Sequence, residues 1–117
     1  MITLRLPLAP SINHYYGQHG VRKYIKKAGL DYRKQVAEIV AEAGHKMLEG
    51  RICIYISVYP ANRIRTDLDN RLKATNDALT HAGIWLDDSQ IDELHIVRKE
   101  VIKGGQMDVV IIEIDKK

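Results

Sequence analysis

Apolar residues fill every second position at 2–6 and at 51–59 of this 117-residue chain, which is the pattern of half-buried strands. This pattern predicts strands at 2–6 and 51–59, and two further strands are predicted at about 93–102 and about 107–114. The run at 51–59 is the clearest, because isoleucine or valine fills nearly every second position and Pro60 ends it. Between the last two runs, Lys103-Gly104-Gly105 is a hairpin signal, so these two strands are expected to pair antiparallel.

A period near 3.6 predicts two amphipathic helices. The first is expected over about 27–48, where apolar and small residues recur at helical spacing: Leu30, Ala37, Val40, Ala41, Gly44 and Leu48. The second is expected over about 67–81, with a buried stripe of Leu68, Leu72 and Leu79. Gly83 is placed as its left-handed C-terminal residue. Residues 10–20 are rich in turn formers and polar rings, which predicts an irregular loop.

These elements predict an α/β (α+β) fold with a mixed sheet and helices packed on it. Their order is strand, helix, strand, helix, strand, strand (β-α-β-α-β-β). Helical crossovers favour parallel neighbours early in the chain. A length of 117 residues leaves too little core for a second unit, so a single domain over 1–117 is expected.

Composition narrows the functional classes. The lone cysteine, Cys53, excludes an intrachain disulfide and a cysteine-rich zinc site, and it suits a reducing compartment. The five histidines show no ligand spacing on one element, which argues against a zinc site. The start of the chain lacks a signal-peptide pattern, and no apolar run approaches the roughly 20 residues of a membrane span. We therefore expect a cytoplasmic protein without a membrane partner.

The net charge of +3 is unevenly distributed. Six basic residues and one acid lie between Arg22 and Lys34, and the basic residues include Lys23, Lys26 and Lys27. Such a cluster fits the electrostatic surface of a nucleic-acid binder and equally fits an ordinary solvated face. The cluster alone leaves both interpretations open.

The strongest chemical signal lies at the two ends of the second predicted helix. Asp67, Asp69 and Lys73 fall at its start, and Asp87 and Asp88 follow just beyond its end. Three arginines surround the first group, namely Arg63, Arg65 and Arg71. Taken alone, the first two aspartates have an ordinary interpretation as helix caps, with an i,i+4 ion pair between Asp69 and Lys73.

A metal site is the second interpretation of these acids. Gathered carboxylates repel one another, and a divalent cation removes that conflict. Oxygen ligands suit Mg²⁺, with Mn²⁺ as a substitute, and such an ion activates water for phosphodiester hydrolysis. Lys73 would orient that water or neutralise the transition state. Burial of Trp85 and Leu86 would fix the pair Asp87 and Asp88 against the body of the protein.

The chain resembles the RusA family of Holliday junction resolvases, which are small dimeric endonucleases. The resemblance rests on the proline loop at 10–16, R-T-D-L-D-N-R-L-K at 65–73, D-A-L-T-H-A-G-I-W-L-D-D-S-Q at 77–90 and the final K-G-G turn. It implies that Asp67, Asp69 and Asp88 hold a catalytic Mg²⁺, with Lys73 as the essential amine and Asp87 in support. It also implies a homodimer that cuts four-way DNA junctions by paired symmetric nicks. Ile64 and Thr66 interrupt a basic run that family members can carry, which bears on the strength of DNA binding.

The residues expected to contact DNA are therefore Arg63, Arg65, Arg71, Lys23, Lys26 and Lys27, with Asn13 lining the site through the matched loop. Two other functions stay open at this point. The first is a junction-binding protein without turnover, whose aspartates serve as caps and ion pairs. The second is a nuclease for flaps or ordinary duplexes.

Overall fold

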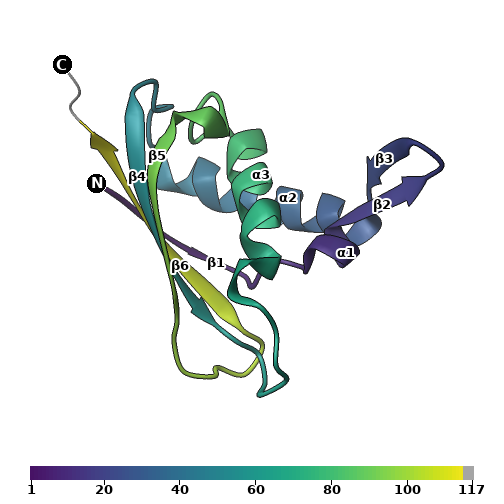
Figure 1. Cartoon of the computed structure of the whole chain (residues 1–117). Coiled ribbons are helices and arrows are strands. Elements are labelled where there is room, and N and C mark those ends of the chain that lie inside the picture. The colour runs from purple at the N-terminus through teal and green to yellow at the C-terminus, as the bar shows by residue number, and fades with distance from the viewer. Residues whose placement is uncertain (115–117) are drawn as a thin grey trace.

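A four-stranded mixed sheet forms the body of the protein, and a computed structural model describes residues 1–114. The strand order is β1 (Ile2–Leu6), β6 (Gln106–Ile114), β4 (Arg51–Tyr59) and β5 (Ile91–Arg98). Two helices, α2 (Lys27–Ala43) and α3 (Leu72–Ala82), cover one face of the sheet (Figure 1). The predicted class, a mixed α+β fold with helices on a sheet, is confirmed.

The order of strands differs from the prediction at the C-terminus. β5 and β6 do not pair with each other, because β4 lies between them, parallel to β5 and antiparallel to β6. Gly104 and Gly105 have positive φ and turn the chain as expected, but residues 99–105 form a wide loop held to the end of β4 instead of a tight hairpin. The most apolar strand therefore takes a central place. Parallel pairing through a helix occurs at β4-α3-β5, whereas β1 pairs antiparallel with β6.

Residues 12–25, which include most of the irregular loop predicted over 10–20, contain regular elements instead. They form a short helix α1 (Ile12–Tyr15) and a two-stranded hairpin, β2 (Tyr16–His19) and β3 (Arg22–Ile25). The hairpin projects from the body of the molecule (Figure 1). The hairpin depends on a glycine and shows no apolar alternation. The ring of Tyr24 lies on Gly17, where the Cβ of any other residue would come within 2.4 Å of the ring.

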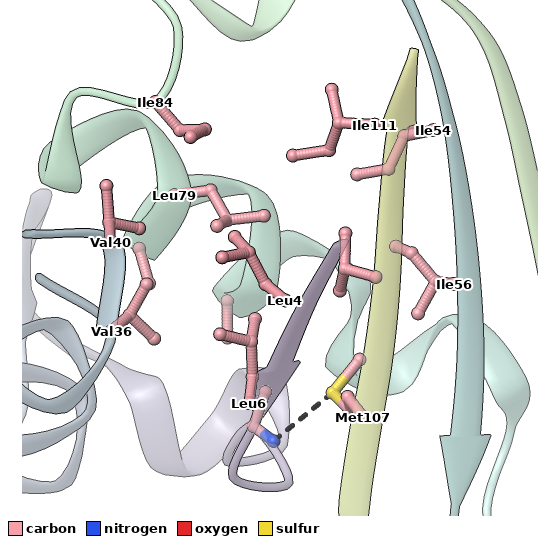
Figure 2. Packing of buried hydrophobic residues seen from close by; sticks show 14 of the residues in the cluster. Leu4, Leu6, Val36, Val40, Ile54, Ile56, Leu79, Ile84, Met107 and Ile111 are labelled. Carbon is pink, nitrogen blue, oxygen red and sulfur yellow. Dashed lines mark hydrogen bonds between the residues drawn. The ribbon is translucent and has the colours of Figure 1, made fainter. Parts of the chain in front are cut away.

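The core lies between the sheet and the helices, and Figure 2 shows its packing. On α2 the buried residues are Gly29, Tyr32, Val36 and Val40, so the predicted stripe is confirmed at Val40 but wrong at Leu30, which is 53% exposed. The helix ends at Ala43, five residues before the expected end, because Gly44 adopts the left-handed conformation (φ 68°).

The second predicted helix begins with a 3₁₀ turn, η1 (Leu68–Arg71), and continues as α3. Gly83 ends it in the left-handed conformation with φ 82°, as expected. A second 3₁₀ turn, η2 (Asp88–Gln90), leads into β5. Within residues 1–114, no helix combines the length and apolar character needed to cross a membrane.

Candidate functional site

Lys73 lies at the edge of a hollow between the β2–β3 hairpin and the start of α3. The hollow has a volume of about 560 Å³, and its lining includes Asn13, Lys23 and Lys26. Four residues that the sequence nominated separately are thus brought to one surface. The ammonium of Lys73 stands 5.5 Å from the centre of the Tyr16 ring, within the range of a cation–π contact.

Tyr16 is placed between the charged groups of this region. Burial raises the pKa of its phenol, and the negative charges of Asp77 and Asp88 raise it further, against an opposing effect of Arg33. Because Tyr16 begins β2, its packing also fixes where the hairpin stands relative to α3.

A polar network beneath the hollow joins three helices. Asp77 on α3 accepts hydrogen bonds from the Tyr15 hydroxyl and from the guanidinium of Arg33, the latter at 2.9 Å. Tyr15 is fully buried, and both charged partners are largely covered. Sequence reasoning missed this network. Its members come from three helices that are far apart in the sequence, so no spacing along one element indicates it.

Asp67 and Asp69 are exposed, and within the described residues 1–114 neither side chain caps the turn η1 or forms an ion pair. Asp67 precedes η1 with an extended backbone, and its carboxylate makes no capping hydrogen bond. Among residues 1–114, Asp69 forms no ion pair with Lys73 or any other cation. The interpretation of these aspartates as a cap and a surface ion pair therefore fails, and both carboxylates are available to a ligand.

The Asp87–Asp88 turn is fixed by Gln90, a residue that the sequence did not single out. Its side-chain oxygen accepts hydrogen bonds from the backbone N–H groups of Leu86 and Asp87, both at 2.9 Å. Its amide donates to the carbonyls of Leu48 and Gly50. Trp85 is buried as expected, but Leu86 is 70% exposed, so the predicted anchoring by Leu86 is wrong.

Asp87 and Asp88 have different surroundings. The Asp87 carboxylate accepts a hydrogen bond from the Ser89 hydroxyl at 2.5 Å, and this bond is the main cause that lowers the pKa of Asp87. Asp87 thus shapes the turn. Asp88, the first residue of η2, is exposed.

The two acidic groups lie at opposite ends of α3. The helix has eleven residues and is about 16 Å long. Asp67 lies beside Val58 and Arg98, at the ends of β4 and β5, whereas Asp88 lies just before the first residue of β5. Within residues 1–114, only Cys53, Glu93 and His95 bring three potential ligand atoms within 4.8 Å of one another. The expected gathering of three aspartates is therefore absent from a single chain, because an uninterrupted helix holds them apart.

The remaining candidate residues differ in their surroundings. Arg71 is half-buried, its guanidinium donates to the carbonyl of Ala9, and burial lowers its pKa. Lys27 forms a surface ion pair with Asp31 at 2.9 Å. Arg63 and Arg65 are exposed in the loop between β4 and η1. Both Arg71 and Lys27 thus have partners within the chain, and their contact with DNA stays a prediction.

Comparison of the sequence with known proteins relates the chain to a family of nucleases. The sequence model of endodeoxyribonuclease RusA matches residues 7–114. The chain is 39% identical over 112 residues to the crossover junction endodeoxyribonuclease RusA of Escherichia coli strain K12, covering 95% of this chain and 93% of the relative. It is 40% identical over 111 residues to the crossover junction endodeoxyribonuclease of Enterobacteria phage 82, covering 94% and 92% of the two chains.

Proposed function

The chain belongs to the RusA family of endodeoxyribonucleases, and from this premise we propose that it resolves four-way DNA junctions by metal-dependent hydrolysis. The observation that carries the proposal is the joint placement of Lys73, Lys23, Lys26 and Asn13 around one hollow. A cationic, concave surface beside a catalytic amine suits a bent DNA strand better than it suits an uncharged ligand.

Asp67, Asp69 and Asp88 are the proposed ligands of Mg²⁺, for which Mn²⁺ can substitute. The residues fit the ion because they offer oxygen ligands only, and because Asp67 and Asp69 are exposed and free of caps and ion pairs within residues 1–114. When bound, the ion supplies an activated water and stabilises charge on the leaving oxygen. Lys73 brings a positive charge to the phosphate, and its contact with the Tyr16 ring holds the ammonium at the edge of the hollow.

A homodimer is the proposed functional unit. Within one chain, α3 separates Asp67 and Asp69 from Asp88, so three-aspartate ligation needs a second source of one group. An isologous twofold interface can supply it, because each copy then offers Asp88 to the acidic pair of the other. Two equivalent sites result, which fits paired nicks on opposite strands of a junction. In this arrangement an isolated copy lacks a complete metal site.

DNA contacts are assigned to two groups of residues. Lys23, Lys26 and Asn13 line the hollow, where they face the strand that is cut. Arg63 and Arg65 extend from the loop before Asp67 and would hold the phosphates next to the metal. Lys27 and Arg71 make a smaller contribution, because each must first give up its partner in the chain.

Nicking of a synthetic four-way junction in Mg²⁺ tests the proposal. We expect the wild-type chain to nick it, and Asp69→Asn and Asp88→Asn each to abolish nicking while junction binding persists. Glu42→Gln is the matched control, because Glu42 is an exposed acid on α2 and belongs neither to the proposed metal ligands nor to the residues assigned to DNA. Cleavage by either site variant at the wild-type rate would show that the metal assignment is wrong. A linear duplex of the same sequence measures selectivity for the junction.

The separation of the acids also favours a second function, junction binding without turnover. On this account the hollow binds DNA, and the aspartates never share an ion. Thermal unfolding distinguishes the two accounts: Mg²⁺ that binds the folded dimer raises its melting temperature, and Asp69→Asn removes that rise. A protein that only binds junctions shows no such dependence on Mg²⁺.

A further inference from the structure

The open face of the sheet carries a group of metal-binding side chains away from the nuclease residues. Cys53 on β4 and Glu93 and His95 on β5 place one potential ligand atom each within 4.8 Å of one another. Register explains the arrangement: Cys53 lies opposite Glu93, and His95 follows two positions along the same strand. All three therefore point to one face, the one opposite the helices, because the alternate residues of β4 fill the core.

A β-bulge creates this alignment. The pairing of β4 with β5 shifts between Ile52 and Cys53, so that Asp92 is the extra residue and Glu93 faces Cys53. The ion pair between Arg51 and Asp92, at 2.6 Å, holds the bulge. Bulges re-aim side chains and recur beside functional sites. Without the extra residue, Glu93 and His95 would project to the other face.

The donor atoms are arranged close to the geometry of a bound zinc ion. Bonds of about 2.3 Å to sulfur and 2.0 Å to nitrogen put the ligand atoms of one tetrahedral zinc about 3.5 Å apart. His95 Nε2 and Glu93 Oε1 are already 3.7 Å apart. Cys53 is 5% exposed, whereas the side chains of Glu93 and His95 are about half exposed, which leaves these two side chains room to rotate toward the thiol.

Tyr55 supports the group from beside it. Its ring stacks on the imidazole of His95, with centres 4.4 Å apart and planes 9° apart. This contact restricts the orientation of the imidazole before any ion arrives. Such partners orient ligands and strengthen metal sites.

From this geometry we infer that Cys53, Glu93 and His95 form a zinc site on the open face of the sheet, distinct from the magnesium site of the nuclease. Thiolate and imidazole ligands favour zinc over magnesium. The negative charges of the thiolate and the carboxylate together balance the double positive charge of the ion. Three protein ligands leave the fourth position to water or an outside donor. The ion ties the edge strand β5 to the sheet, immediately after the turn that carries Asp88.

Titration of the purified chain with Co²⁺, a spectroscopic substitute for zinc, tests the inference. Cys53 is the only cysteine of the chain, so a thiolate-to-cobalt absorption band can arise from this site alone. We expect a band that saturates at one ion per chain and that Zn²⁺ abolishes. His95→Phe keeps a ring on Tyr55 but removes the ligand. This variant should weaken cobalt binding by more than the roughly 10- to 100-fold that is typical when a residue supporting a ligand is changed. Glu93→Gln should also weaken cobalt binding.

Two controls make the result decisive. His81→Gln, at an exposed histidine on α3, and Asp69→Asn should leave the band unchanged, since neither residue belongs to the group. Circular dichroism confirms that each variant is folded. Absence of the band in the folded wild-type chain would overturn the inference. Undiminished binding by His95→Phe would also overturn it, because the thiol would then bind cobalt without the group.

Discussion

The change Gln90→Met tests what holds the Asp87–Asp88 turn in place. Methionine has nearly the same volume as glutamine, so the variant removes hydrogen bonds without leaving a large cavity. The Gln90 side chain is 7% exposed and makes four hydrogen bonds, two as acceptor and two as donor. At a net value of about 1 kcal/mol for each bond, with water reaching some of the freed groups, we expect a loss of about 3 kcal/mol.

Urea unfolding of the variant measures this loss, with Gln35→Met as the control because Gln35 is exposed on α2. The control should change stability by less than about 0.5 kcal/mol. Junction nicking by Gln90→Met should fall more than junction binding. The turn carries the proposed metal ligand Asp88, whereas no residue of the turn lines the hollow that is proposed to bind DNA. A loss of less than about 1 kcal/mol would refute the reasoning that these four bonds hold the turn.

Three further predictions follow from other contacts. Burial raises the pKa of Tyr15 and Tyr32, so both phenols stay neutral in the folded chain at a pH where they ionise in the unfolded chain. The free energy of unfolding should therefore be level up to about pH 10 and fall above it. The fall should be less steep in Tyr15→Phe. Lys23→Gln should make the salt dependence of junction binding weaker, with the slope of log affinity against log salt less negative by about 0.9. Lys46→Gln should leave this slope unchanged. Gly83→Ala should cost about 1 kcal/mol in urea unfolding, because φ is 82° there while the nearest atom, Met47 Cε, leaves ordinary room.

The sequence was sufficient for elements with strong local periods. The strand at 51–59 and the helix that ends at Gly83 were located from alternation and from a helix-ending glycine. The order of strands was not accessible, because turn chemistry at Gly104 and Gly105 fixes a reversal of the chain but not the neighbour that a strand finds. The β2–β3 hairpin was not predicted, because its strands bury no residue in the core and therefore show no apolar alternation in the sequence.

The sequence named candidate residues for the site but did not give their arrangement in space. Lys73 and the lysines of the hairpin were nominated separately, and only the hairpin fold brings them to one hollow. The acids at the two ends of α3 were interpreted as neighbours, although the length of the helix already implied their separation. The group around Cys53 was missed, because Glu93 and His95 lie on one strand and Cys53 on another, and only the bulge brings Cys53 opposite Glu93.

Complementation between two inactive variants tests the central claim, that the acids at the two ends of α3 meet through pairing of two copies. Asp69→Asn and Asp88→Asn chains are unfolded together, refolded as a mixture and assayed for nicking of a four-way junction in Mg²⁺. In a mixed dimer one site carries both changes and the other carries neither. With random pairing, about a quarter of the wild-type sites are then intact, and nicking should recover to that level. If the mixture stays as inactive as its components, each chain completes its own site and the claim is wrong.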